Sequence, residues 1–165
     1  MRGILHDAQP SSENICELLN HWLTRQDAVH TIAVYAALPG EVNLSSFIGK
    51  NPQIRWAFPR VSGVDLVFHH VLTPLSDLEL GNFHIHEPYP SLLEISIPLI
   101  DAFICPGLAF DSNGGRLGRG KGYYDRALKH ARAAAQKIGV CFPTQRVVDT
   151  FSEPHDVLMD RIISG

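Results

Sequence analysis

The segment with the most evident chemistry is GRLGRGKGYYDR, which occupies residues 115–126 and combines glycines with positive charge. Its alternating glycines are Gly118, Gly120 and Gly122. Its cations are Arg116, Arg119 and Lys121. Glycine lets a backbone adopt positive φ and approach a ligand closely, and a helix that begins at Tyr123 would add N–H groups that favour an anion. Together these features predict a cradle for a polyphosphate, although such a segment can also be an ordinary surface loop.

The same segment resembles a known phosphate-binding pattern but lacks one part of it. Residues Gly115 to Lys121 fit GxxxxGK, yet Gly122 stands where that loop has a serine or threonine hydroxyl for Mg²⁺. A divalent cation would therefore need carboxylates. Asp125 follows the cradle and Asp156 lies further on, and oxygen ligands of this kind suit a hard cation such as Mg²⁺. Either aspartate could instead be an ordinary helix-terminal or turn residue.

The elements that must position the cradle alternate between helices and strands. Apolar residues at three- and four-residue steps predict a helix that begins at Ser11 or Ser12, and a second helix is expected over residues 123–136. Asn43 is expected to cap a short helix that ends at Ile48. Runs of β-branched and apolar residues predict strands at 31–38, 54–61, 64–71, 102–105, 137–142 and 161–164. Residues 73–93 are expected to form a long connection with little regular structure.

This order of elements predicts an α/β fold. Because the inner strands are apolar on both faces, we expect a mostly parallel central sheet that is covered on both sides. Sheets of this type bind ligands at the carboxyl ends of their strands. The loops after Leu38, Cys105 and Phe142 are therefore the expected places for a binding site.

Composition narrows the class of protein. The 165 residues suit a single domain over 1–165, and 45% apolar with 19% charged residues is ordinary for a globular protein. A net charge of −3 argues against a nucleic-acid partner. No apolar stretch reaches the roughly 20 residues that span a bilayer, so we expect no membrane partner. Three cysteines favour a reducing compartment over a disulfide framework, and we expect a cytoplasmic protein.

One family matches these features in order. PGLAFD followed by GGRLGRGKGYYDR resembles the C-terminal signature of the 5-formyltetrahydrofolate cyclo-ligases, also called 5,10-methenyltetrahydrofolate synthetases. Four further segments resemble landmarks of that family in the same order: VYAALPGEVN, FPRV, GNFHIHEP and HDVLMDRIIS. The resemblance covers roughly residue 32 to the end of the sequence.

The resemblance implies a three-layer α/β/α fold of the CoA-transferase-like type. It also implies conversion of 5-formyltetrahydrofolate to 5,10-methenyltetrahydrofolate with ATP and Mg²⁺, in a protein that we expect to be a monomer. The implied ATP-binding residues are Arg116, Leu117, Gly118, Arg119, Gly120, Lys121, Gly122, Tyr123 and Tyr124. The implied folate-binding residues are Glu41, Ala36, Arg119, Gly120, Lys121, Gly122 and Tyr123. Asp125 and Asp156 would hold Mg²⁺, and the implied catalytic residues are Lys121, Arg119 and Tyr123.

The beginning of the sequence departs from the family pattern. Family members usually start with a helix whose lysine and arginine reach ATP, and this pair cannot be placed here, because Arg2 and then Arg25 are the first cations. We therefore expect a shortened N-terminus. The alternatives are a non-catalytic relative that binds folate or nucleotide, another enzyme acting on phosphate esters, and a nucleic-acid module, which the acidic balance disfavours. His84 and His86 would share a face of an extended segment, as a metal pair or as ordinary loop residues.

Overall fold

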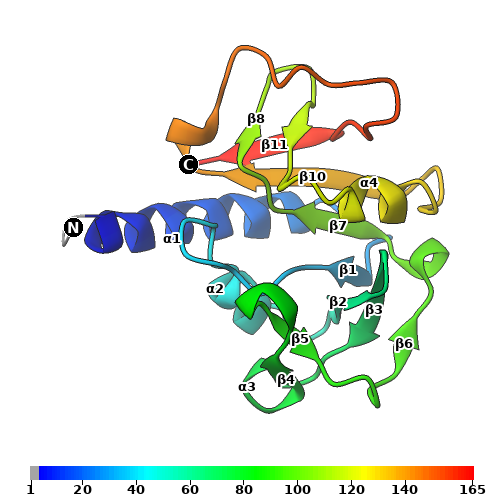
Figure 1. The fold of residues 1–165 in the computed structure, drawn as a ribbon. Coiled ribbons are helices and arrows are strands. Elements are labelled where there is room, and N and C mark those ends of the chain that lie inside the picture. The colour runs from blue at the N-terminus through cyan, green and yellow to red at the C-terminus, as the bar shows by residue number, and fades with distance from the viewer. Residues whose placement is uncertain (1–3) are drawn as a thin grey trace.

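A seven-stranded sheet forms the centre of the computed structural model, which describes residues 4–165 and, within the first helix, side chains from Ser12 onward. The strands lie in the order β11-β10-β7-β1-β2-β3-β6 (Figure 1). Their bounds are β1 Thr31–Ala33, β2 Arg55–Ser62, β3 Asp65–His70, β6 Glu94–Ile95, β7 Ala102–Cys105, β10 Gln136–Cys141 and β11 Arg161–Ser164. Neighbours from β11 to β2 pair in parallel, whereas β3 is antiparallel to both β2 and β6. The predicted α/β class with a mostly parallel sheet is confirmed.

Helices cover both faces of this sheet. On one face, α1 (Ile4–Leu23) and α2 (Ser45–Lys50) pack on apolar side chains of the strands. On the other face lie α4 (Tyr123–Leu128) and the hairpin of β8 (Ala109–Phe110) with β9 (Arg116–Leu117). The two buried clusters follow the strand alternation: Ile32, Ile104 and Ile138 face the first layer, and Ala33, Phe103 and Cys105 face the second. This arrangement is the expected three-layer α/β/α architecture.

The connection at 73–93 has more regular structure than expected. It contains α3 (Pro74–Asp77) and a small antiparallel sheet of β4 (Leu78–Leu80) with β5 (His86–Pro88). This sheet is anchored to β2 through Arg60, whose Nη1 donates to Glu79 Oε1 at 3.0 Å and to the Pro88 carbonyl at 3.0 Å. The buried Glu87 completes the anchor by accepting from the Val61 amide at 3.2 Å. These long-range bonds order a segment that its composition did not mark as regular.

Two helices differ from their predicted bounds. The first begins at Ile4 rather than at Ser11 or Ser12, and the Ser12 hydroxyl accepts from the Asn43 amide at 3.2 Å instead of marking a helix start. The helix predicted over 123–136 ends at Leu128, because the chain after it turns so that Arg132 bonds to the carbonyl of Ile100 and the carboxylate of Asp101. Helix propensity is a weak prior that such tertiary bonds override.

The remaining differences are smaller. Strand β1 ends at Ala33 rather than at residue 38, since the chain leaves the sheet to build a turn. Helix α2 starts at Ser45, and the Asn43 side chain accepts from the Ser45 amide at 2.9 Å. The other predicted strands are confirmed within one or two residues. Three-residue 3₁₀ turns occur at Asn82–His84, Ile97–Leu99 and Pro143–Gln145. Over the described residues, no helix combines the length and apolar character needed to cross a membrane.

Candidate active site

The turn after β1 holds Glu41 in a defined position. The Tyr35 hydroxyl donates to the Val42 carbonyl at 2.9 Å, which closes the loop back onto its own strand end. Glu41 Oε2 accepts from the Leu38 amide at 2.9 Å, and Gly40 between them has a φ of 87° that favours glycine. The Glu41 side chain is only 10% exposed. The turn therefore fixes the position of the second carboxylate oxygen, Oε1.

Arg119 of the glycine cradle meets this glutamate. Its Nη2 lies 3.5 Å from Glu41 Oε1, although 78 residues separate the two in the sequence. Ala36, which was also predicted to lie near the folate, is half-buried at the start of the same turn and packs on the core. The structure thus brings together three of the predicted site residues at the carboxyl end of β1, where a parallel sheet binds its ligands.

A buried carboxylate that the sequence reasoning did not single out supports the cradle. Asp111, at the end of β8, accepts at Oδ1 from the amides of Asn113 and Gly115, each at 2.9 Å. Its Oδ2 accepts from the Thr150 amide at 2.9 Å and from the Thr150 hydroxyl at 2.7 Å. The hydroxyl and amide of Thr150 and the two loop amides lower the pKa of Asp111 to about 2. The signal for it was present: an aspartate that opens the run Asp-Ser-Asn-Gly-Gly is typical of a turn closed by its own side chain.

The cradle itself is open toward solvent. Gly120 and Gly122 have φ values of 90° and 69°, as the alternating glycines predicted, whereas Gly118 does not adopt positive φ. Leu117, Arg119 and Lys121 are exposed. The Nζ of Lys121 lies 5.7 Å from the centre of the Phe83 ring, a cation–π contact that brings the β4–β5 loop against the cradle.

Arg116 has a different environment from the other two cations. Its side chain is 7% exposed, and Nη1 donates to the Pro106 carbonyl at 3.0 Å. Its Cζ lies 5.2 Å from the centre of the Tyr124 ring, and its Nη2 lies 3.9 Å from Asp125 Oδ2. Among the described residues, Arg116 Nε is buried without a hydrogen-bond partner. The guanidinium therefore braces the base of the cradle through Nη1 and its charge contact with Asp125.

The two tyrosines begin a helix that is only six residues long, so its dipole is weaker than the predicted one. Tyr123 is half-buried, with the Arg126 guanidinium carbon 5.4 Å from its ring centre. Burial raises the pKa of Tyr124, and the neighbouring Cys105 adds to this effect. Tyr124 is therefore a neutral group that also packs against the buried cluster of the second layer.

The two predicted metal ligands lie in adjoining segments. Asp125 Oδ1 accepts from the Val157 amide at 3.0 Å, and Val157 follows Asp156 directly. Asp156 Oδ2 accepts from the Glu153 amide at 2.8 Å, and its Oδ1 lies 3.4 Å from His155 Nε2. Each carboxylate thus has one oxygen bound by a backbone amide and a second oxygen without such a bond.

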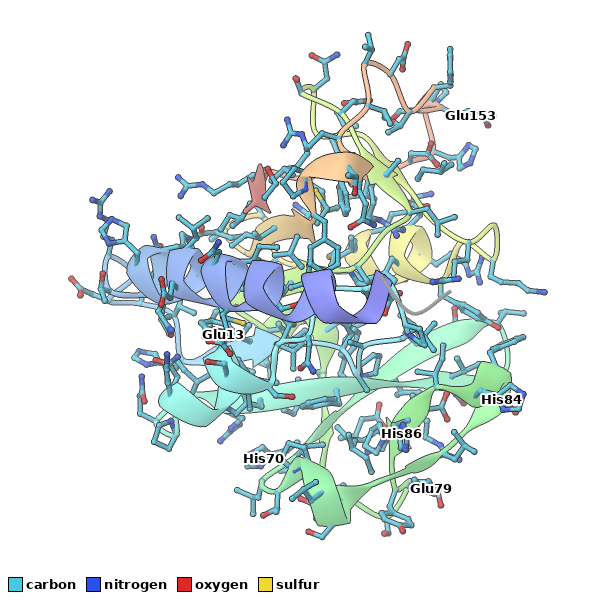
Figure 2. All side chains as sticks on the ribbon, turned by 90° about the vertical axis from the view of Figure 1, so that its left-hand side faces the viewer. Glu13, His70, Glu79, His84, His86 and Glu153 are labelled. Atoms are coloured by element: carbon cyan, nitrogen blue, oxygen red, sulfur yellow. The ribbon has the colours of Figure 1, made fainter. Side chains whose placement is uncertain are left out.

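No cluster of three or more histidine, cysteine or acidic side chains suited to a metal ion occurs within the described part of the chain. His84 and His86 do not share an extended face, because His84 ends a 3₁₀ turn and has a φ of 58°. Figure 2 shows the two labelled histidines at separate places on the lower part of the molecule. Of the two alternatives left open for these histidines, the structure favours ordinary loop residues.

Comparisons with known proteins identify one family. The model of the 5-formyltetrahydrofolate cyclo-ligase family matches residues 18–165. The 5-formyltetrahydrofolate cyclo-ligase of Mycoplasma pneumoniae is 31% identical over 156 residues, which cover 92% of this chain and 83% of the relative. That of Escherichia coli K12 is 30% identical over 82% of this chain and 78% of the relative. The Mycolicibacterium smegmatis enzyme is 41% identical, but that alignment covers 53% of this chain and 45% of the relative.

Solved structures give the same result. The 5,10-methenyltetrahydrofolate synthetase of Mycoplasma pneumoniae superposes with a TM-score of 0.76 at 28% identity, over 95% of this chain and 86% of that one. The synthetase of Aquifex aeolicus superposes with a TM-score of 0.82 at 28% identity, over 96% and 80%. The chain therefore belongs to the 5-formyltetrahydrofolate cyclo-ligase family of enzymes.

Proposed function

We propose that this protein converts 5-formyltetrahydrofolate to 5,10-methenyltetrahydrofolate, with ATP as co-substrate and Mg²⁺ as cofactor, and releases ADP and phosphate. Family membership supports the overall conversion. The observation that carries the proposal for this site is the 3.5 Å contact between Arg119 and Glu41. It joins a phosphate-type cradle to the turn that resembles the family's folate-contacting segment, so groups suited to both substrates lie side by side.

The cradle residues have the charge that the first step needs. The formyl oxygen is a poor leaving group until it accepts the γ-phosphoryl group, and this transfer depends on positioning and on neutralisation of charge. Arg119 and Lys121 are exposed on a backbone held open by glycines, so both can approach phosphate oxygens. Tyr123 would border the folate beside them.

The second step needs no nucleophile from the protein. The neighbouring folate nitrogen attacks the activated formyl carbon, and the new carbon–nitrogen bond closes the ring. The carbon–oxygen bond then breaks, the former formyl oxygen leaves with the phosphate, and the nitrogen loses its proton. Glu41 would orient the pterin, since the Leu38 amide and Arg119 fix its carboxylate.

Asp125 and Asp156 fit a role in holding Mg²⁺. This ion commonly uses one or two protein carboxylates together with substrate phosphates and water. Each of the two aspartates retains one oxygen that no backbone amide occupies. When bound, Mg²⁺ would neutralise charge on the transferred phosphoryl group.

The test is a steady-state assay with 5-formyltetrahydrofolate, ATP and Mg²⁺, in which the near-ultraviolet absorbance of the methenyl product is followed. Product should form only when ATP is present. Lys121→Ala should lower kcat/KM by roughly 100-fold or more, because it removes a cation from the transferred phosphoryl group. Lys129→Ala is the matched control, since Lys129 is an exposed lysine just after the same helix and should leave activity unchanged.

Two outcomes would revise the proposal. A folded protein that gains thermal stability from folate or ATP but makes no product would be a non-catalytic binding relative. Full activity of Asp125→Ala across a Mg²⁺ titration would remove Asp125 from the metal assignment and leave Asp156 to be tested alone.

A further inference from the structure

A polar cavity lies between the turn that precedes the cradle and the start of β11. Its volume is about 320 Å³, and its walls include Asn113, Arg146, Asp160 and Arg161. None of its lining residues belongs to the cradle or to the turn that holds Glu41. Arg161 is the first residue of β11, whereas Arg146 lies in the segment that follows β10. No residue of the lining is among those assigned above to ATP, folate or Mg²⁺.

The charges of this cavity are unbalanced. Arg146 and Arg161 are both exposed, and neither has a carboxylate within 4 Å or a side-chain hydrogen bond within the described residues. Asp160 is the acidic residue of the lining, but its carboxylate already interacts with Lys137. The Lys137 amide donates to Asp160 Oδ2 at 2.8 Å, and Lys137 Nζ lies 3.9 Å from the same oxygen. Two guanidinium groups are therefore available in a protein whose net charge is −3.

The wall opposite the arginines is rigid. The Asn113 amide is held by Asp111 at 2.9 Å, and the Met159 amide donates to the Gly114 carbonyl at 2.7 Å. Gly114 has a φ of 87°, and a Cβ there would meet the Met159 carbonyl oxygen. β11 is also an edge strand, which leaves some of its N–H groups without a strand partner. The cavity thus combines a hydrogen-bonded backbone wall with exposed, forked donors.

Positive charge continues past Arg161 along the same edge. Arg161 also lines a hollow of about 210 Å³ whose other walls include His21 and Arg25, at the end of α1. Cations from three separate parts of the chain therefore gather around the amino end of β11. Among the described residues none of these arginines pairs with a carboxylate, so their charge is available to attract an anion.

We propose that this cavity binds the oxyanion group of a small phosphate- or carboxylate-bearing metabolite, at a site separate from the active site. Guanidinium groups bind both kinds of oxyanion in a forked, bidentate way, and Asn113 can add an amide donor. The volume suits a small ligand, at the lower end of the range for small-molecule sites. The inference does not depend on the reaction proposed above.

The test is an amide NMR titration with inorganic phosphate in one arm and succinate in the other. Binding should shift the amides of Gly114 and Ile162 in a saturable way with at least one probe, and the responding arm identifies the oxyanion. Phosphate bound at the cradle would instead shift Gly120 and Gly122, so the two sites are read separately. The same shifts at Gly114 should persist in Lys121→Ala.

Substitution of both arginines provides the decisive comparison. Arg146→Gln with Arg161→Gln should weaken the saturable response at least tenfold, whereas Lys50→Gln with Arg55→Gln, which changes net charge equally at exposed positions, should not. The single change Arg146→Gln lies in a loop and should weaken binding severalfold without touching β11. The proposal is overturned if neither probe saturates, or if the Arg pair and the control pair respond alike.

Discussion

Replacing Asp111 by asparagine should destabilise the protein through the loop that supports the cradle. The carboxylate accepts four hydrogen bonds, from Asn113, Gly115 and twice from Thr150. An asparagine can keep the two bonds at one oxygen. Its amide nitrogen would then face the Thr150 amide, so two donors would oppose each other in a site that is 3% exposed.

The size of the effect follows from the pKa and from the lost bond. A pKa shift from 3.8 to about 2 corresponds to at most about 2.4 kcal/mol, which solvent near the loop reduces to roughly 1–2 kcal/mol. An unsatisfied Thr150 amide adds about 1 kcal/mol. We therefore expect a loss of about 2–3 kcal/mol at neutral pH, or roughly 5–10 °C in Tm for a chain of this length.

The pH dependence gives the sharper test. Because the folded pKa of Asp111 lies below its unfolded value, its stabilisation is fully present above about pH 4 and is lost as pH falls from 3.8 toward 2. The unfolding free energies of the wild type and of Asp111→Asn, measured in urea, should therefore begin to converge below about pH 4 and approach each other toward pH 2. Asp149→Asn, which alters an exposed carboxylate with one local bond to Phe151, is the control and should cost little. A deficit under about 0.5 kcal/mol at neutral pH, or one that is unchanged at low pH, would refute the reasoning.

Two further predictions concern packing and thiols. Gly115→Ala should lower the free energy of unfolding, measured by chemical denaturation, by about 1–3 kcal/mol, because its Cβ would meet Thr150 Oγ1 and Asp111 Oδ2. The control Gly49→Ala lies in α2 with open space around it and should be neutral or stabilising by up to about 1 kcal/mol. Equal losses for both variants would contradict this reasoning. All three cysteines are free and buried; burial raises the thiol pKa of each, that of Cys105 to about 12. A reagent that modifies free thiols by disulfide exchange, used at about pH 8, should therefore react with these cysteines only as fast as the protein unfolds. Rapid reaction in the folded protein would show instead that a thiol is accessible.

Local sequence was sufficient for several elements and for the cradle. The strands at 102–105 and 161–164 have the bounds that the sequence predicts, since each is a short run rich in apolar residues. Glycine chemistry allowed the positive φ seen at Gly120 and Gly122, although Gly118 of the same segment does not adopt it. These features depend on residues that are close in the sequence, and the periodicity of apolar residues predicts such local structure well.

Features that depend on distant partners could not be read in the same way. The helix after Tyr123 ends early because Arg132 bonds to Asp101, and the β4–β5 sheet forms because Arg60 and Glu87 tie it to β2. Burial of Arg116 likewise depends on Pro106 and Tyr124. No window of local residues contains these partners, so propensity and pattern could not weigh them.

The sequence by itself therefore determined which residue types were available for chemistry: glycines and cations in one short segment, and carboxylates in others. Only the tertiary structure decided which of them meet. It set Arg119 against Glu41, placed Asp125 beside the segment of Asp156, turned Arg116 into a buried brace, and left Arg146 and Arg161 at a separate cavity. The physical reason is that charge and backbone freedom are properties of single residues, whereas burial, distance and hydrogen-bond partners arise only when a sheet brings remote segments to the same strand ends.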